Sequence, residues 1–175
     1  MNFRIGLCTK EQLPEIMEIF NEAIVHSTAL YDYKPRTMEF MNEWYTEKQL
    51  GNYPIIGLFD SMDLLLGFAS YGSFRIRPAY KYTVEHSVYV RVDQRGKGFG
   101  SELLKEIIRF AEIQDYHVLI GGIDASNQVS IHIHEKEGFV LNGIIYEAGF
   151  KFGRWLDLAF YQRILKTPKN PVGDI

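Results

Sequence analysis

Cysteine is almost absent from this chain of 175 residues, in which Cys8 is the only one. A single cysteine cannot form an internal disulfide, and a chain without disulfides suits a reducing compartment, so we expect a cytoplasmic protein. Long apolar runs are also absent, since no segment reaches the roughly 18 uninterrupted apolar residues of a membrane-spanning helix. Residues 1–8 lack a basic region followed by an apolar run, so we predict no signal peptide.

Positive charge is in short supply as well. The 19 Lys and Arg residues are outnumbered by 22 Asp and Glu, which gives a net charge of -3. Binding to nucleic acid would need a local basic patch, and a short cluster such as Arg75, Arg77 and Lys81 is too small for one. We therefore expect neither a nucleic acid nor a membrane as a partner.

What the chain does contain is ample material for one hydrophobic core. Apolar residues make up 46% of the sequence and aromatic residues 14%, and this length suits one domain. There is no internal repeat and no linker. We predict a single domain over residues 1–165 and a flexible tail over residues 166–175, which holds two prolines and several polar residues.

The hydrophobic pattern predicts both strands and helices. Strands are expected over residues 3–7, 54–59, 64–71, 82–92, 117–123, 139–152 and 155–163. Helices are expected after a capping box formed by Thr9 and Gln12, and then over residues 35–48, 102–114 and 126–137. This order predicts an α+β fold with a mixed sheet.

One of these helices is ambiguous. Val129, Ile131 and Ile133 alternate, which by period alone indicates a strand. We still predict a helix over residues 126–137, because Ser126 or Asn127 is a good N-cap and a crossover is needed between the strands that begin at 117 and 139.

A glycine-rich turn over residues 94–101 joins a predicted strand to a predicted helix. Alternating glycines let the backbone approach a ligand, and the free N–H groups at the start of the helix favour an anion such as phosphate. A Walker loop is excluded, because Lys97 lies between two glycines and no Ser or Thr follows it directly. A dinucleotide fingerprint is excluded, because Gly96, Gly98 and Gly100 alternate in mid-chain. The plain alternative is a turn with no ligand.

Two motifs in the correct order resemble a known family. Residues Arg95 to Gly100 match the Arg/Gln-x-x-Gly-x-Gly pattern of the GNAT superfamily of N-acetyltransferases. Asn127 and the run His134 to Phe139 stand where that superfamily has its Asn and its Tyr-Glu-Lys-x-Gly-Phe signature. Residues 83–90, 148–155 and 160–163 are similar to the phosphinothricin acetyltransferase branch, and the similarity covers about residues 3–165.

The resemblance implies the GNAT acyltransferase fold, a mixed and mostly antiparallel sheet of about seven strands flanked by helices on both faces. It implies acetyl-CoA as cosubstrate, no metal, and a homodimer. The substrates of that branch are phosphinothricin, methionine sulfoximine and methionine sulfone, which are acetylated on the α-amino group. The residues it assigns to the cofactor are Val88, Tyr89, Val90, Arg95, Gly96, Lys97, Gly98, Phe99, Gly100, Ser101 and Asn127.

Two residues are the predicted catalytic groups. Glu85 is an ionisable group in a strand otherwise rich in Val and Tyr, and it resembles the family's general base, acting directly or through water. The plain alternative is a solvated glutamate. His134 occupies the position of the tyrosine that protonates the leaving thiolate in many members, and its alternative is a packed helix histidine. A metal site through His132 and His134 is rejected, because no second zincin histidine follows and no cysteine is near.

The predicted substrate loop runs from Phe74 to Tyr80. Arg75 and Arg77 would point the same way in an extended chain and could clamp a carboxylate, although a solvated basic loop would look the same. The predicted substrate residues are Arg75, Ile76, Arg77, Tyr80, Glu85, His86 and Ser87. The leading function is N-acetylation of a small amino acid or analogue. The alternatives are acetylation of peptide N-termini or other amines, and an acyl-CoA-binding module without turnover.

Overall fold

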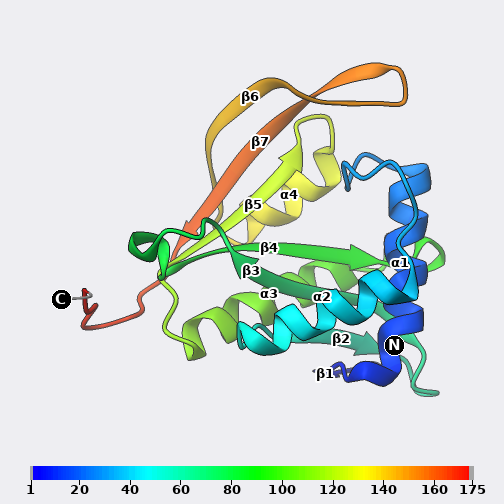
Figure 1. Cartoon of the computed structure of the whole chain (residues 1–175), viewed down its shortest axis with the longest axis horizontal. Helices are drawn as coiled ribbons and strands as arrows, with labels where there is room; N and C mark the ends of the chain where they lie inside the picture. The colour runs from blue at the N-terminus through cyan, green and yellow to red at the C-terminus, as the bar shows by residue number, and fades with distance from the viewer. Residues whose placement is uncertain (1, 174–175) are drawn as a thin grey trace.

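The computed structural model describes residues 2–173. Within them, seven strands and four α-helices follow the predicted order of one strand, two helices, three strands, a helix, a strand, a helix and two strands (Figure 1). The strands are β1 (Arg4–Leu7), β2 (Ile55–Phe59), β3 (Leu65–Ser73), β4 (Thr83–Val90), β5 (Val118–Asp124), β6 (Val140–Lys151) and β7 (Arg154–Ile164). The helices are α1 (Leu13–His26), α2 (Met38–Leu50), α3 (Phe99–Ile113) and α4 (Gln128–Lys136).

The strands form one mixed sheet in the order β1-β2-β3-β4-β5-β7-β6. The β4–β5 pair is parallel, and the other neighbouring pairs are antiparallel. This confirms the predicted mixed, mostly antiparallel sheet. None of the helices in residues 2–173 is long and apolar enough to cross a membrane.

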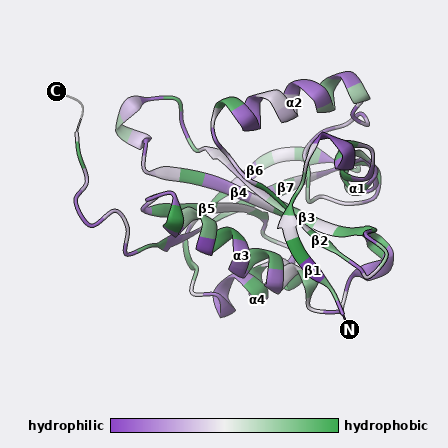
Figure 2. Cartoon of the chain, turned by 90° about the horizontal axis from the view of Figure 1, so that it is seen from below, coloured by the Kyte–Doolittle hydropathy of each residue, from purple (hydrophilic) through white to green (hydrophobic). Residues whose placement is uncertain are grey.

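Helices cover both faces of the sheet, as predicted (Figure 2). On one face, Ile16 and Phe20 of α1 and Met41 of α2 pack with Phe59 and Phe68 of the sheet. On the other face, α3 buries its apolar stripe against the central strands, through Phe99, Leu103, Leu104, Ile107, Ile108 and Ala111. The apolar spacing that predicted these helices is therefore the spacing of the side chains that enter the two cores.

The first helix begins with the predicted capping box. The Thr9 backbone N–H donates to Gln12 Oε1 at 2.8 Å, and the Thr9 hydroxyl accepts from the Glu11 backbone. The box starts a 3-10 turn, Lys10–Gln12, and α1 continues from Leu13. Pro14 lies in the first turn of α1, where a missing backbone donor costs least.

Two helices begin at residues other than those predicted. The second was predicted from residue 35 but begins at Met38, because Thr37 is the N-cap and its hydroxyl accepts from the Phe40 N–H. The third was predicted from residue 102 but begins at Phe99, because Gly98 is its N-cap in the left-handed conformation. The predicted strand over 82–92 ends at Val90, since residues 92–94 form a 3-10 turn.

The ambiguous segment is a helix, α4, as predicted. Asn127 caps it by accepting a hydrogen bond from the Ser130 N–H at 3.1 Å. The alternating Val129, Ile131 and Ile133 do not form a strand face, because Val129 is largely exposed while Ile131 and Ile133 pack against the core. The N-cap and the crossover argument therefore outweighed the two-residue period.

The long β6–β7 hairpin is fastened to α1 by one buried lysine. The Lys151 ammonium donates to the backbone oxygens of Ile24 at 2.7 Å, Ser27 at 2.9 Å and Leu30 at 2.7 Å. The Ile24 and Ser27 carbonyls lie at the end of α1, where the helix leaves them without internal partners, and the Leu30 carbonyl lies in the loop that follows. A cation at this end is also favoured by the helix dipole.

Candidate active site

The candidate site lies where β4 and β5 separate. Their parallel pairing covers three residues and stops at Glu85, whereas β4 continues to Val90 beside β3. Figure 1 shows the two strands diverging from there, and we call this opening the wedge. The Arg91 N–H bonds to the Leu66 carbonyl of β3. Because N–H groups alternate between the two sides of a strand, those of Val88 and Val90 face the wedge.

The glycine turn stands at the mouth of the wedge, between the end of β4 and the start of α3. Gly96 and Gly98 have φ angles of 77° and 84°, which only glycine adopts at low cost. A β-carbon at either position would meet nothing within 4 Å, so the backbone faces open space. No side chain caps α3, and the first amides of its helix are available to an anion.

Other residues of the turn are placed differently. Arg95 forms an ion pair with Glu22 of α1 at 2.5 Å and also bonds the Val90 carbonyl. Lys97 reaches the Gln94 side chain. Phe99 is buried in the core, so only its backbone can contribute to a cofactor site.

Three further predicted cofactor positions lie at the starts of α3 and α4. The Gly100 position lies against Ile133 of α4, with 3.4 Å between a built β-carbon and Cδ1, which allows α3 and α4 to approach. Ser101 is half-buried and lies in the first turn of α3, the helix that follows β4, and Asn127 is the N-cap of α4, the helix that follows β5. The starts of the two helices therefore lie at the two strands that border the wedge.

Glu85 is half-buried and is the last residue of β4 that pairs with β5. Burial raises the pKa of its carboxyl, and the Arg75 guanidinium partly opposes that by lowering it. Gly122 of β5 lies beside it, since a β-carbon there would be 3.1 Å from Glu85 Oε1. The carboxylate therefore has room only because position 122 has no side chain.

Ser87 and Tyr89 share the sheet face of Glu85, by the alternation of β4. Tyr89 packs with Phe20 and Phe68 in the core. Burial raises the pKa of its phenol to about 12. Tyr89 therefore belongs to the packed side of the site, against Phe20 and Phe68, and Ser87 is the small polar residue between Tyr89 and Glu85 on the same face of β4.

His86 and His134 lie on the opposite face from Glu85, on the side of α3 and α4. Both are buried, and their Nε2 atoms are 2.9 Å apart. His134 Nδ1 is 2.7 Å from the Ser130 carbonyl oxygen. Burial lowers the pKa of both imidazoles; the charge of His134 lowers that of His86 further, whereas the Ser130 backbone partly raises that of His134. The structure therefore does not bring His86 together with the other predicted substrate residues.

The predicted substrate loop is an exposed rim beside Glu85. Arg75 stacks over the Phe74 ring at 4.4 Å and bonds the Phe74 carbonyl. Tyr80 packs edge-on against Phe74, while Arg77 and Ile76 point outward, Ile76 being 96% exposed. Of the two arginines, Arg75 is the one whose charge acts on Glu85.

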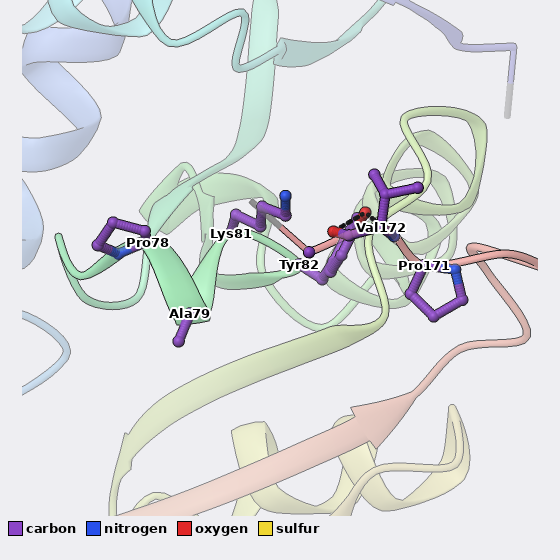
Figure 3. A pocket seen from close by; sticks show the side chains of 7 residues that line it. Pro78, Ala79, Lys81, Tyr82, Pro171 and Val172 are labelled. Carbon is purple, nitrogen blue, oxygen red and sulfur yellow. Dashed lines mark hydrogen bonds between the residues drawn. The ribbon is translucent and has the colours of Figure 1, made fainter. Parts of the chain in front are cut away.

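Beside this loop lies an open pocket of about 400 Å³, lined on one side by residues 78–82 and on the other by the C-terminal segment (Figure 3). The Val172 N–H donates to the Tyr82 hydroxyl at 3.0 Å, and that hydroxyl donates to the Val172 carbonyl at 3.2 Å. Earlier in the same segment, Thr167 bonds the Tyr116 carbonyl. The described part of the tail therefore contacts the residues that lead into β4, at Tyr82, and into β5, at Tyr116.

Comparison with known proteins agrees with this geometry. The model of the acetyltransferase (GNAT) domain family matches residues 5–160. The chain belongs to the GNAT acetyltransferase family. It is 42% identical over 158 residues to the L-methionine sulfoximine/L-methionine sulfone acetyltransferase of Pseudomonas aeruginosa, covering 90% of this chain and 92% of that protein.

Solved structures show the same GNAT fold. An Acinetobacter baylyi protein described as an acetyltransferase has a TM-score of 0.97 and 54% identity, with 99% of this chain and 97% of that chain covered. An acetyltransferase of Salmonella typhimurium, solved with its cofactor acetyl-CoA, has a TM-score of 0.94 and 35% identity, with 99% and 100% covered. The predictions of family, fold and enzyme class are confirmed.

Several features of the GNAT site were not predicted from the sequence. The Gly121–Gly122 pair, which makes room on both faces of β5, is visible as two adjacent glycines in an apolar strand and could have been noticed. The Arg95–Glu22 and His86–His134 contacts join residues far apart in the chain and left no local signal. Within residues 2–173, no three His, Cys, Asp or Glu side chains gather as a metal site would require.

Proposed function

We propose that this enzyme transfers acetyl from acetyl-CoA to the α-amino group of a small amino acid or analogue, of the methionine sulfoximine, methionine sulfone or phosphinothricin type. The observation that carries the proposal is the wedge, where the Glu85 carboxyl, the Val88 and Val90 donors and the glycine turn meet. Relatives with these substrates in their names align over nearly the whole chain, the Pseudomonas aeruginosa enzyme over 90% of it and a Streptomyces phosphinothricin N-acetyltransferase over 93%.

The residues present fit acetyl-CoA. Gly96 and Gly98 leave open space in front of the first amides of α3, which suits a diphosphate. Asn127 and the wedge-facing amides of β4 would hold the arm that follows. When bound, acetyl-CoA supplies an acetyl thioester to the wedge. The Val90 N–H is there a donor for a carbonyl oxygen on which negative charge develops.

Glu85 supplies the base in this proposal. An α-ammonium group must lose a proton before it can attack a carbonyl, which at pH 7 costs roughly 3–4 kcal/mol for an amine pKa of about 9–10. Glu85 can take that proton directly or through a water, and its raised pKa brings it closer to the amine than that of an exposed glutamate. His134 is the second catalytic residue we propose, serving the thiolate that leaves.

Arg75 and Arg77 are the proposed carboxylate clamp. Both lie on the exposed rim next to Glu85, and a planar guanidinium matches a carboxylate in two hydrogen bonds. A basic rim disfavours polycationic amines, which need an acidic pocket. We assign Ile76 and Tyr80 to the same rim and Ser87 to the pocket wall.

The test is release of free thiol from acetyl-CoA with methionine sulfoximine, methionine sulfone and phosphinothricin, beside a peptide N-terminus and an aminoglycoside. We expect turnover with the first group, and a Glu85→Gln variant that is slower by about 10²–10⁴-fold. The exposed Glu39→Gln on α2 is the matched control and should behave as wild type. Turnover only with peptides would overturn the substrate proposal, and no turnover with any amine would leave a binding module.

We also propose that the enzyme is a homodimer. The β6–β7 hairpin exposes a row of large apolar side chains, among them Val140, Leu141, Ile145, Tyr146 and Trp155. Such a row on one element marks an interaction surface. Sedimentation should give twice the chain mass for wild type and the chain mass for Ile145→Asp. Met62→Asp, on the exposed β2–β3 turn, is the control, and a monomeric wild type would refute the dimer.

A further inference from the structure

The site contains a second buried group of titratable atoms besides Glu85. His86 comes from β4 and His134 from α4, and their side chains meet on the far side of the sheet from Glu85. Their Nε2 atoms are 2.9 Å apart, and their rings stack at 29° with centroids 5.1 Å apart. Each is about 5–6% exposed. The proposed function uses His134 and gives no role to this contact.

The surrounding residues restrict the positions of the two imidazole rings. A β-carbon at Gly121 of β5 would lie 3.0 Å from His86 Cε1 and 3.3 Å from His134 Nε2. Phe139 packs on both rings, at 5.1 Å from each centroid. The glycine on one side and the phenyl ring on the other shape a slot for two imidazoles.

Hydrogen-bond chemistry fixes where the protons are. The Ser130 carbonyl can only accept, so His134 Nδ1 at 2.7 Å from it carries a proton. A neutral His134 then has a lone pair on Nε2. The 2.9 Å contact needs one proton, which must come from His86 Nε2. His86 Nδ1 has no hydrogen-bond partner at bonding distance, and the Ile120 backbone is the polar group that acts on this ring, raising its pKa against the effect of burial.

The neutral state is the one that the surroundings favour. Among the described residues, no carboxylate hydrogen-bonds to either ring, and burying an unpaired cation is costly. On the flanking strands, the residues paired in register with His86 and with Gly121 are tyrosines, Tyr71 and Tyr161, whose hydroxyls are already in hydrogen bonds. Tyr71 of β3 bonds Gln114, and Tyr161 of β7 bonds Glu135.

We propose that His86 is a positioning residue for His134, holding it through the Nε2–H as the Nδ1-protonated tautomer, so that the two histidines act in the transfer as one unit. Neutral His134 has one N–H, and the Ser130 carbonyl holds it. In this state both ring nitrogens of His134 are in hydrogen bonds, Nδ1 with the Ser130 carbonyl and Nε2 with His86, so the contact with His86 fixes the tautomer and the ring orientation of His134.

Nitrogen NMR of the wild-type enzyme tests the tautomers without reference to activity. The chain has five histidines, and spectra of His86→Phe and His134→Phe assign the two signals. At neutral pH we expect His134 protonated on Nδ1 alone and His86 on Nε2 alone. A His134 protonated on Nε2, or two rings that each carry both protons, would overturn the proposal.

Kinetics test whether the pair acts as one unit, which rests on the proposed function. We expect each single Phe variant to lower kcat by about 10²–10⁴-fold with the KM for acetyl-CoA little changed, and the double variant to be no slower than the singles. Exposed His132→Gln, on the same helix, should keep the wild-type rate. Single effects that multiply in the double variant, or a His86→Phe enzyme with wild-type kcat, would contradict the inference. A wild type inactive on every amine would refute the proposed function, and the NMR result would still decide the tautomers.

Discussion

Lys151→Met is the substitution whose effect the structure defines best. Methionine keeps most of the length and apolar stem of lysine but removes its three N–H donors. In the native protein all three donors are used, one each by the carbonyls of Ile24, Ser27 and Leu30. The lysine is 4% exposed and therefore has no water to exchange for them.

The expected loss follows from the burial of the three acceptors. Ile24 is buried, so its carbonyl would stay unsatisfied at a cost of about 1–3 kcal/mol. Ser27 and Leu30 are half-buried, so water can replace the lysine there at about 0.5–1.5 kcal/mol each. Removing the cation from the end of α1 adds a few tenths. Because such terms do not add fully, we expect a loss of about 2–5 kcal/mol.

Urea unfolding followed by circular dichroism measures this loss, with hydrogen exchange to locate it. Protection should fall first at the end of α1 and in the loop from residue 27 to residue 37. Lys34→Met is the control, since Lys34 is exposed in the same loop and should change stability by no more than about 0.5 kcal/mol. A Lys151→Met loss below about 1 kcal/mol would show that the three bonds contribute little, and the reasoning would fail.

Three further changes test the site and the fold. Arg75→Gln should move the acid limb of the kcat/KM profile to higher pH, because that arginine lowers the pKa of Glu85 and the carboxylate is the active form; an unmoved or lower midpoint contradicts this. Gly98→Ala places a β-carbon on a residue with φ 84°, which costs about 1–2 kcal/mol of backbone strain. We expect the KM for acetyl-CoA to rise by the corresponding factor of about 5–30, while the KM for the amine, the internal control, stays unchanged. Burial lowers the pKa of Lys48 to about 8. Between about pH 8 and the ordinary lysine pKa of about 10.4 the unfolded chain binds the proton and the folded protein does not, so the free energy of unfolding rises with pH. In urea titrations, wild type should therefore gain about 1–3 kcal/mol relative to Lys48→Met between about pH 7.5 and 10. Parallel pH dependence in the two proteins would refute it.

Much of the fold could be predicted because its signals are local. The Thr9 capping box, the periodic stripe of α3 and the glycine turn each occupy a few neighbouring residues, and each was found in the structure. Helix starts were less certain, since a proline at 35 and a threonine at 37 both qualify as a beginning and only packing chooses. Side-chain pairs such as Arg95–Glu22 join positions 73 apart and have no local pattern at all.

The same limit explains why the contact of His86 with His134 was not predicted. The position of His86 in the sequence, next to Glu85, suggested a second substrate contact. Adjacent residues of a strand face opposite sides of the sheet, so a substrate contact by Glu85 argues against one by His86. His134 lies on α4, which covers the sheet face opposite Glu85. His86 is the histidine of β4 whose side chain points to that face, and it is therefore the residue that can contact His134.

The two adjacent glycines of β5 connect these arrangements. Position 121 faces the histidine pair and position 122 faces Glu85, so β5 leaves room for the proposed catalytic groups on both of its faces. A side chain at either position would press on one group and leave the other alone, because the pleat separates them. The parallel pairing of β4 with β5 ends at Glu85, at the level of these glycines. The end of the β4–β5 pairing, the space for Glu85 and the space for the histidine pair therefore all lie at one short stretch in which β5 has no side chains.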